Sequence, residues 1–280
     1  MSEIIESDNL VSFFIITFVF SWLLWLPNLL SSIGVFDYIP IFGLLRLIGT
    51  FGPFIAAFSL TYFRQGKEGV KILWKRGWKC ENTTFLILSF LLLPLLYGFA
   101  FYLSVLSERI SFTGYYTRDK LAYFFAEFIF IFFMGGPFQE EFGWRGYALD
   151  RLQSKWNALE SSMTLGGIWG FWHLPLFFIN EAPQKGQPFF SYLFFTIILS
   201  IFFTWLYNNS NRSIFVAMIF HTTHNISISL FPLNMTSKGN FFLANLLNIV
   251  IALLLVFYGP KTLTRNSKKQ NKIEIKNIYY

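Results

Sequence analysis

Two adjacent carboxylates and an arginine lie in an unusually apolar part of this chain. Glu140, Glu141 and Arg145 belong to the segment 139–146 (QEEFGWRG), which directly follows the apolar run 128–134 (FIFIFFM). An ionised side chain at the centre of a membrane helix costs roughly 2.5–3.5 kcal/mol on insertion scales. Such groups beside apolar segments therefore indicate a functional site, in which a glutamate can act as a general base.

Imidazole groups occur in two further apolar segments, which hold all three histidines of the chain. His173 ends the segment 169–173 (WGFWH). His221 and Asn225 are four residues apart and share one helix face, while His224 lies on the flank of that face. A carboxylate base, an assisting imidazole and hydrogen-bond donors for an oxyanion are what hydrolysis of an amide bond requires.

Each of these groups also has an ordinary structural explanation when it is taken alone. Glu141 and Arg145 are spaced to form an ion pair on one face of a helix. A single histidine on an apolar face is commonly a packed core residue. The pair His221 and Asn225 can hydrogen-bond across helices, which contributes about 0.6 kcal/mol in membranes. Their joint occurrence in three separate apolar segments favours an active site.

The composition predicts which elements must hold these residues. The chain is 54% hydrophobic and only 13% charged, whereas ordinary soluble domains carry about 25% charged residues. A membrane-spanning helix needs about 20 mostly apolar residues. Eight stretches qualify, at roughly 9–33, 43–63, 84–107, 120–138, 161–180, 189–208, 213–231 and 240–258. We therefore expect an all-α fold, a polytopic membrane helix bundle of about eight transmembrane helices.

The fourth of these stretches contains the sequence Gly135-Gly136-Pro137. Glycine weakens a helix and proline lacks a backbone donor, so the helix is expected to break there. A restart with Pro137 near the first helical position would place Glu140 and Glu141 in or near the first turn.

The net charge of +7 is concentrated in two segments, 64–79 and 261–280. Because cytoplasmic loops of membrane proteins are enriched in Lys and Arg, both segments and both termini are expected on the cytoplasmic side. We expect one membrane domain over 1–260, followed by a basic cytoplasmic tail over 261–280. The 64–82 loop, with Trp74 and Trp78, is expected to lie on the membrane surface. Membrane lipids rather than nucleic acid are the expected partners of these cations.

The three segments together resemble the motif pattern of a known family. Glu140-Glu141-x-x-x-Arg145, an aromatic-x-x-x-His ending at His173, and His221-x-x-x-Asn225 are similar in order and spacing to the CPBP family. This family contains type 2 CAAX prenyl proteases and bacterial relatives that are often described as Abi or bacteriocin-processing proteins. The resemblance covers about residues 120–231, and Trp169 stands where a phenylalanine is common.

The resemblance implies an intramembrane endopeptidase whose site opens toward the cytoplasm. By this resemblance Glu140, helped by His173, activates a water molecule, and His221 and Asn225 stabilise the oxyanion. Glu141 and Arg145 hold the first motif in place.

Two interpretations of the cofactor stay open. Glu140, His173 and His221 match a zinc site with an open fourth position. The family is called metalloprotease, yet it is also described as acting through glutamate without a bound ion, and we favour the metal-free interpretation. The single Cys80 excludes an internal disulfide and a cysteine-based metal site.

The expected substrate is a membrane-associated protein or peptide in a bacterial cell membrane, in peptide maturation, protein processing or bacteriocin immunity. The main alternative is a non-catalytic immunity or peptide-binding protein with the same fold. A proton-coupled transporter is a third hypothesis, because intramembrane Glu and His also form proton relays. The two similar halves that transporters often show are not evident in this sequence.

Overall fold

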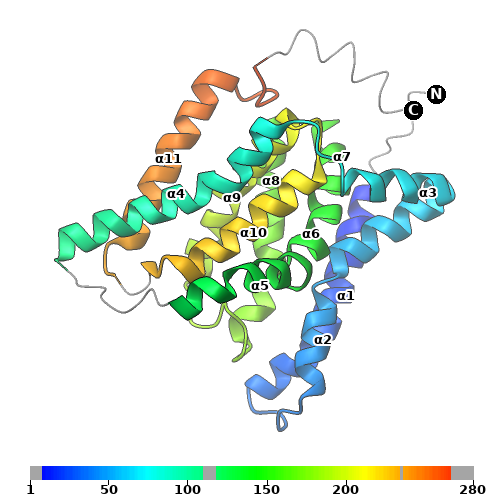
Figure 1. Ribbon diagram of the computed structural model, residues 1–280. Coiled ribbons are helices and arrows are strands. Elements are labelled where there is room, and N and C mark those ends of the chain that lie inside the picture. Colours follow the sequence, from blue (N-terminus) through cyan, green and yellow to red (C-terminus); the bar gives the residue numbers. More distant parts are fainter. Residues whose placement is uncertain (1–7, 110–117, 234–235, 266–280) are drawn as a thin grey trace.

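The computed structural model describes residues 8–109, 118–233 and 236–265, and these residues form helices and connections without a strand. Figure 1 shows the helices packed into a bundle in which α6 lies among α1, α5, α8 and α10. The helices are α1 (Asp8–Ser32), α2 (Ile41–Gly49), α3 (Gly52–Arg76), α4 (Thr83–Glu108), α5 (Arg118–Met134), α6 (Pro137–Gly143), η1 (Trp144–Leu149), α7 (Asp150–Gln153), α8 (Ala158–Trp172), η2 (Leu174–Phe178), α9 (Phe189–Asn209), α10 (Ile214–Leu230) and α11 (Gly239–Tyr258). This architecture confirms the expected all-α membrane bundle.

Helices occupy all eight predicted membrane stretches, but they differ in length. In the described part of the chain, α1, α4, α9 and α11 are each long and apolar enough to cross a membrane. The bent pair α2 and α3 gives a fifth candidate. The helices α5, α8 and α10 have only 15 to 17 residues, and two of them, α8 and α10, carry the histidine motifs.

Two predicted spans differ from the structure. The stretch 43–63 is not one helix, because α2 and α3 meet at an angle of 49°. Pro53 is the second residue of α3 and cannot donate the backbone hydrogen bond that would continue α2. The stretch 161–180 is helical only to Trp172, and Pro175 follows within the short 3₁₀ helix η2. Proline disfavours the α conformation of the residue before it, which ends α8 early.

The segment expected as a surface loop at 64–82 is largely helical. It belongs to α3, which continues to Arg76 and is kinked at Gly66, where φ is 63° and ψ is −159°. A positive φ of this kind is readily adopted only by glycine. Beyond the kink, the second half of α3 returns toward the bundle, and α3 packs against α6 and η1.

Candidate active site

The helix break predicted before the two glutamates is present, and α6 begins at Pro137. Gly136 has a φ of 114°, and its backbone N–H donates to Gln139 Oε1 at 2.7 Å. A Cβ at this position would stand 2.7 Å from Glu140 Oε1 and 3.5 Å from His221 Cε1. Only glycine suits this position, because both the backbone conformation and the space beside Glu140 exclude a side chain.

Glu140 is buried, and one oxygen of its carboxylate is held by two tryptophans. Trp169 Nε1 donates to Glu140 Oε2 at 2.7 Å, and Trp144 Nε1 donates to the same oxygen at 3.2 Å. Trp144 follows Glu140 by four residues, whereas Trp169 reaches it from α8. The other oxygen, Oε1, faces the narrow space at Gly136 and His221. The carboxylate is therefore fixed on one side and directed toward His221 on the other.

Glu141 connects the first motif to the third. Its carboxylate accepts two hydrogen bonds from Arg145 NH1, each of 2.9 Å. His221 Nδ1 lies 2.8 Å from Glu141 Oε1. Because a carboxylate only accepts, this contact places a proton on Nδ1 of His221. Neutral His221 therefore presents a lone pair on Nε2. Only the imidazolium form of His221 can donate a hydrogen bond from Nε2.

The Arg145 guanidinium is fully buried between aromatic rings. Its Cζ lies 3.7 Å from the ring centroid of Phe203 and 4.9 Å from that of Trp169. Its Nε and NH2 atoms have no hydrogen-bond partner among the described residues, so the ring faces, together with Glu141, offset the loss of water around the cation. Arg145 thus belongs to the packed wall of the site and holds Glu141 in place.

His173 is linked to Glu140 through a single residue. Its Nδ1 lies 2.8 Å from the carbonyl oxygen of Trp169, the residue whose indole donates to Glu140. Since a carbonyl accepts, Nδ1 of His173 carries the proton and Nε2 keeps a lone pair. His173 therefore presents an acceptor, with its tautomer set by the backbone.

The adjacent residues His224 and Asn225 of α10 point to different neighbours. Asn225 is partly exposed, and its Nδ2 donates to the carbonyl oxygen of Gly135 at 3.0 Å. This bond places Asn225 at the break between α5 and α6, next to the glycine beside Glu140. His224 is directed away from this group, since its Nδ1 lies 3.3 Å from the hydroxyl of Tyr97 on α4.

The structure thus brings the six predicted site residues into one connected group. Glu140 and His173 meet through Trp169, Glu141 bonds to both Arg145 and His221, and Asn225 reaches the α5–α6 break. Trp144 and Trp169 donate hydrogen bonds directly to Glu140, but the sequence analysis did not predict them as site residues. Their signal in the sequence is a tryptophan four residues after Glu140 and another four residues before His173.

The described residues show no preassembled cluster of metal ligands. They contain no group of three or more His, Cys, Asp or Glu arranged to hold an ion. Zinc binding by Glu140, His173 and His221 therefore stays a prediction of the sequence.

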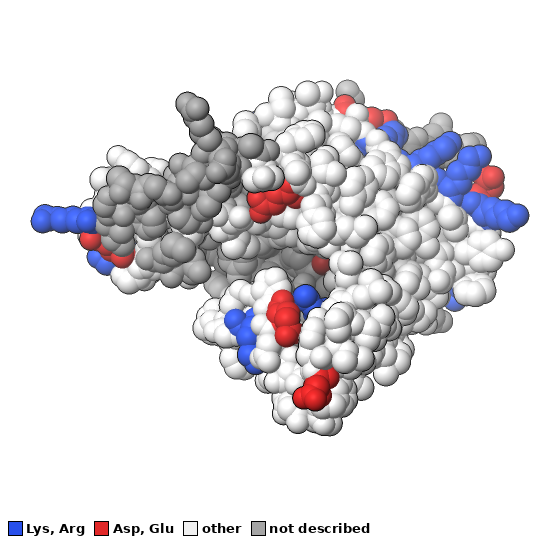
Figure 2. Space-filling view, turned by 60° about the horizontal axis from the view of Figure 1, so that its bottom comes forward, with Lys and Arg blue, Asp and Glu red and all other residues white. Residues whose placement is uncertain are grey.

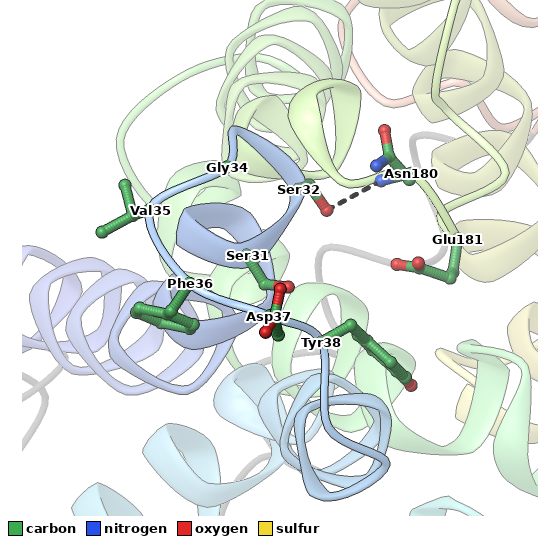
Figure 3. Close-up of a pocket in the computed structure, with 9 residues that line it drawn as sticks. All are labelled: Ser31, Ser32, Gly34, Val35, Phe36, Asp37, Tyr38, Asn180 and Glu181. Carbon is green, nitrogen blue, oxygen red and sulfur yellow. Dashed lines mark hydrogen bonds between the residues drawn. The ribbon is translucent and has the colours of Figure 1, made fainter.

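A cavity of about 520 Å³ lies elsewhere, between the α1–α2 connection and the loop after η2 (Figure 3). The backbone N–H of Asn180 donates to Ser32 Oγ at 3.0 Å across it. Its other lining residues include Asp37, Tyr38 and Glu181. None of the predicted site residues lines this cavity.

Comparison with known proteins gives two matches that contain the whole site. Residues 122–227 match the family of Rce1-like type II CAAX prenyl endopeptidases. The chain is also 29% identical over 238 residues to CAAX prenyl protease 2 of Methanococcus maripaludis, a similarity that covers 81% of this chain and 86% of that protein. Together these matches support the resemblance seen in the motifs: across all three motifs the chain is similar to CAAX-type intramembrane proteases.

Proposed function

We propose that this protease cleaves a peptide bond of a membrane-associated protein or peptide through a water molecule activated by Glu140. The observation that carries the proposal is the asymmetric environment of the Glu140 carboxylate. Two indole N–H groups bind Oε2, which leaves Oε1 beside Gly136 and His221 to accept a proton from water. A base held in one orientation loses little freedom when it reacts.

His173 assists by accepting a second hydrogen bond from the same water. Its Nε2 lone pair is available because Nδ1 donates to the Trp169 carbonyl. Glu140 and His173 both bond to Trp169, which fixes their positions relative to one another. Attack of the water oxygen on the scissile carbonyl forms a tetrahedral intermediate, and the proton taken by Glu140 is returned to the leaving amine.

His221 and Asn225 stabilise the negative oxygen of that intermediate. Asn225 has two amide hydrogens and uses one on the Gly135 carbonyl, which leaves the other for the substrate. His221 donates to the oxyanion through Nε2 when it is an imidazolium, while its Nδ1 stays bonded to Glu141. Donors in a site without bulk water act strongly on a developing charge.

The substrate is proposed to be a membrane-associated protein or peptide in a bacterial membrane, reached from the cytoplasmic side. The relative from Methanococcus maripaludis is named as a prenyl protease, and a lipid-anchored C-terminal peptide is one form that such a substrate takes. Peptide maturation and immunity to a bacteriocin by proteolysis are both compatible with this chemistry.

The proposal is tested by comparing peptide termini in membranes and medium of cells that express the wild type or Glu140→Gln. This substitution keeps the shape of the side chain and removes the base. Termini that depend on the wild type, at equal protein level, would identify the substrate. Glu181→Gln, an exposed carboxylate outside the site, is the matched control and should leave the termini unchanged. Identical termini in Glu140→Gln and wild type would refute glutamate catalysis and favour a binding protein with this fold.

A further inference from the structure

The second half of α3 presents a row of cations. Lys67, Lys71 and Lys75 are exposed and spaced four residues apart, so they share one helix face. Lys71 is paired with Glu68 at 3.8 Å, but these side chains are 59% and 78% exposed, and pairs of this kind contribute little. Figure 2 shows Lys and Arg gathered at the side of the molecule where α3 lies. The face therefore presents several cations to an anionic surface.

Large apolar side chains accompany these cations. Ile72, Trp74 and Trp78 are between 42% and 52% exposed. Figure 1 shows that the second half of α3 turns back beside the first half and runs across the direction of α1. A helix that combines Lys with exposed Trp and Ile is typical of the membrane–water interface. Both its composition and its direction are those expected of a helix at headgroup depth.

The same helix packs directly on the elements that carry the glutamates. The ring of Trp74 stacks on Phe142 of α6, with centroids 5.7 Å apart and planes at 6°. Arg76 donates to the carbonyl oxygen of Gly146 in η1 at 3.2 Å. At the end of the helix, a Cβ on Gly77 would stand 2.1 Å from Phe142. Displacement of this helix would therefore change the packing around Glu141 and Arg145.

We propose that Lys67, Lys71 and Lys75 bind the headgroups of anionic phospholipids, and that this contact holds the second half of α3 against α6 and η1. Each basic residue near an anionic membrane surface contributes about a fivefold gain in binding. Activity should then rise with the anionic lipid content of the membrane. Only the activity readout rests on the proposed function, because lipid binding does not require catalysis.

Binding is tested with a fluorophore on Cys80, the single cysteine of the chain, which is exposed near this helix. Energy transfer from the dye to headgroup-labelled phosphatidylglycerol or phosphatidylcholine is measured in vesicles that contain the inactive Glu140→Gln protein. We expect phosphatidylglycerol to be enriched several-fold around Cys80. Replacing the three lysines, Lys67, Lys71 and Lys75, by Gln should bring the ratio close to one.

The matched control is Lys185→Gln with Lys238→Gln, two exposed cations on other parts of the chain, and it should keep the enrichment. The lipid site would be overturned by a phosphatidylglycerol to phosphatidylcholine ratio of one in the protein that keeps its three lysines. An unchanged ratio in the triple Lys→Gln variant would also overturn it. Cleavage of the identified substrate is then measured against phosphatidylglycerol fraction. Selective binding with lipid-independent cleavage would overturn the regulatory part alone. Absence of cleavage in every lipid would instead refute the proposed function and the regulatory part, while the binding result stands.

Discussion

Trp169→Phe tests whether the indole that binds Glu140 orients the base. The substitution removes the N–H that donates to Glu140 Oε2 at 2.7 Å. The aromatic ring that packs against Phe203 and His221 is largely kept. The hydrogen bond of His173 is also kept, because its acceptor is the backbone carbonyl of residue 169.

The expected effect follows from the strength of this bond. A hydrogen bond to a charged group contributes about 1.5–3 kcal/mol, which corresponds to a loss of about 10- to 150-fold in rate. Trp144 still donates to the same oxygen, at the longer distance of 3.2 Å, so we expect the lower part of this range. The loss should appear in kcat with little change in KM, because the indole N–H is bonded to Glu140.

The assay uses the substrate peptide found by the comparison of termini, with the enzyme in proteoliposomes of fixed lipid composition. Trp205→Phe is the matched control, since Trp205 is a buried tryptophan whose Nε1 has no hydrogen-bond partner in the described part of the chain. We expect this control to retain wild-type kcat. Full activity of Trp169→Phe, or an equal loss in Trp205→Phe, would contradict the orienting role of the Trp169 indole.

Three further predictions concern the backbone, the pH dependence and the cofactor. Gly136→Ala should lower kcat about 100-fold, because a Cβ there would stand 2.7 Å from Glu140 Oε1 and would displace the base. The control is Gly186→Ala, at a positive φ with open space around it, which should lower stability but change activity little in the same assay. Asp150 lies outside the membrane-spanning helices. Burial by itself raises the pKa of Asp150, but the guanidinium groups of Arg76 and Arg212 hold this pKa below its ordinary value of 3.8. Ionised Asp150 therefore stabilises the fold at neutral pH, and this contribution is lost as the pH falls through its lowered pKa. Asp150→Asn should lower the melting temperature at pH 7, and the difference from wild type should shrink below about pH 4; a difference that is constant with pH would contradict this reasoning. Finally, activity should survive treatment with 1,10-phenanthroline, with metal content measured in parallel, and loss of activity that added Zn²⁺ restores would refute metal-free catalysis.

Much of the local structure could be predicted from the sequence, because it depends on neighbours within one helix. The break before α6 follows from glycine and proline chemistry, and its position at Pro137 is confirmed. The four-residue spacing of Glu141 and Arg145 predicted their contact, and the contact is present although Arg145 lies in the π-helix η1. The spacing of His221 and Asn225 likewise places them on one side of α10.

Other features of the site depend on how the helices cross. The contact of His221 with Glu141 joins α10 to α6, and the bond from Trp169 to Glu140 joins α8 to α6. Crossing angles and distances arise from the packing of many side chains, and the spacing within any single helix leaves them open. For the same reason, the sequence places an aromatic residue at position 169, but its role as a hydrogen-bond donor to Glu140 follows only from the structure.

The sequence by itself indicated the helical membrane class, the family resemblance and the residue types of the candidate site, because composition and motif spacing are properties of the chain alone. Only the tertiary structure decided which nitrogen of each histidine is engaged, which oxygen of Glu140 is held, and that α3 returns to pack on α6. These outcomes depend on contacts between residues distant in the sequence, and such contacts exist only once the helices have assembled.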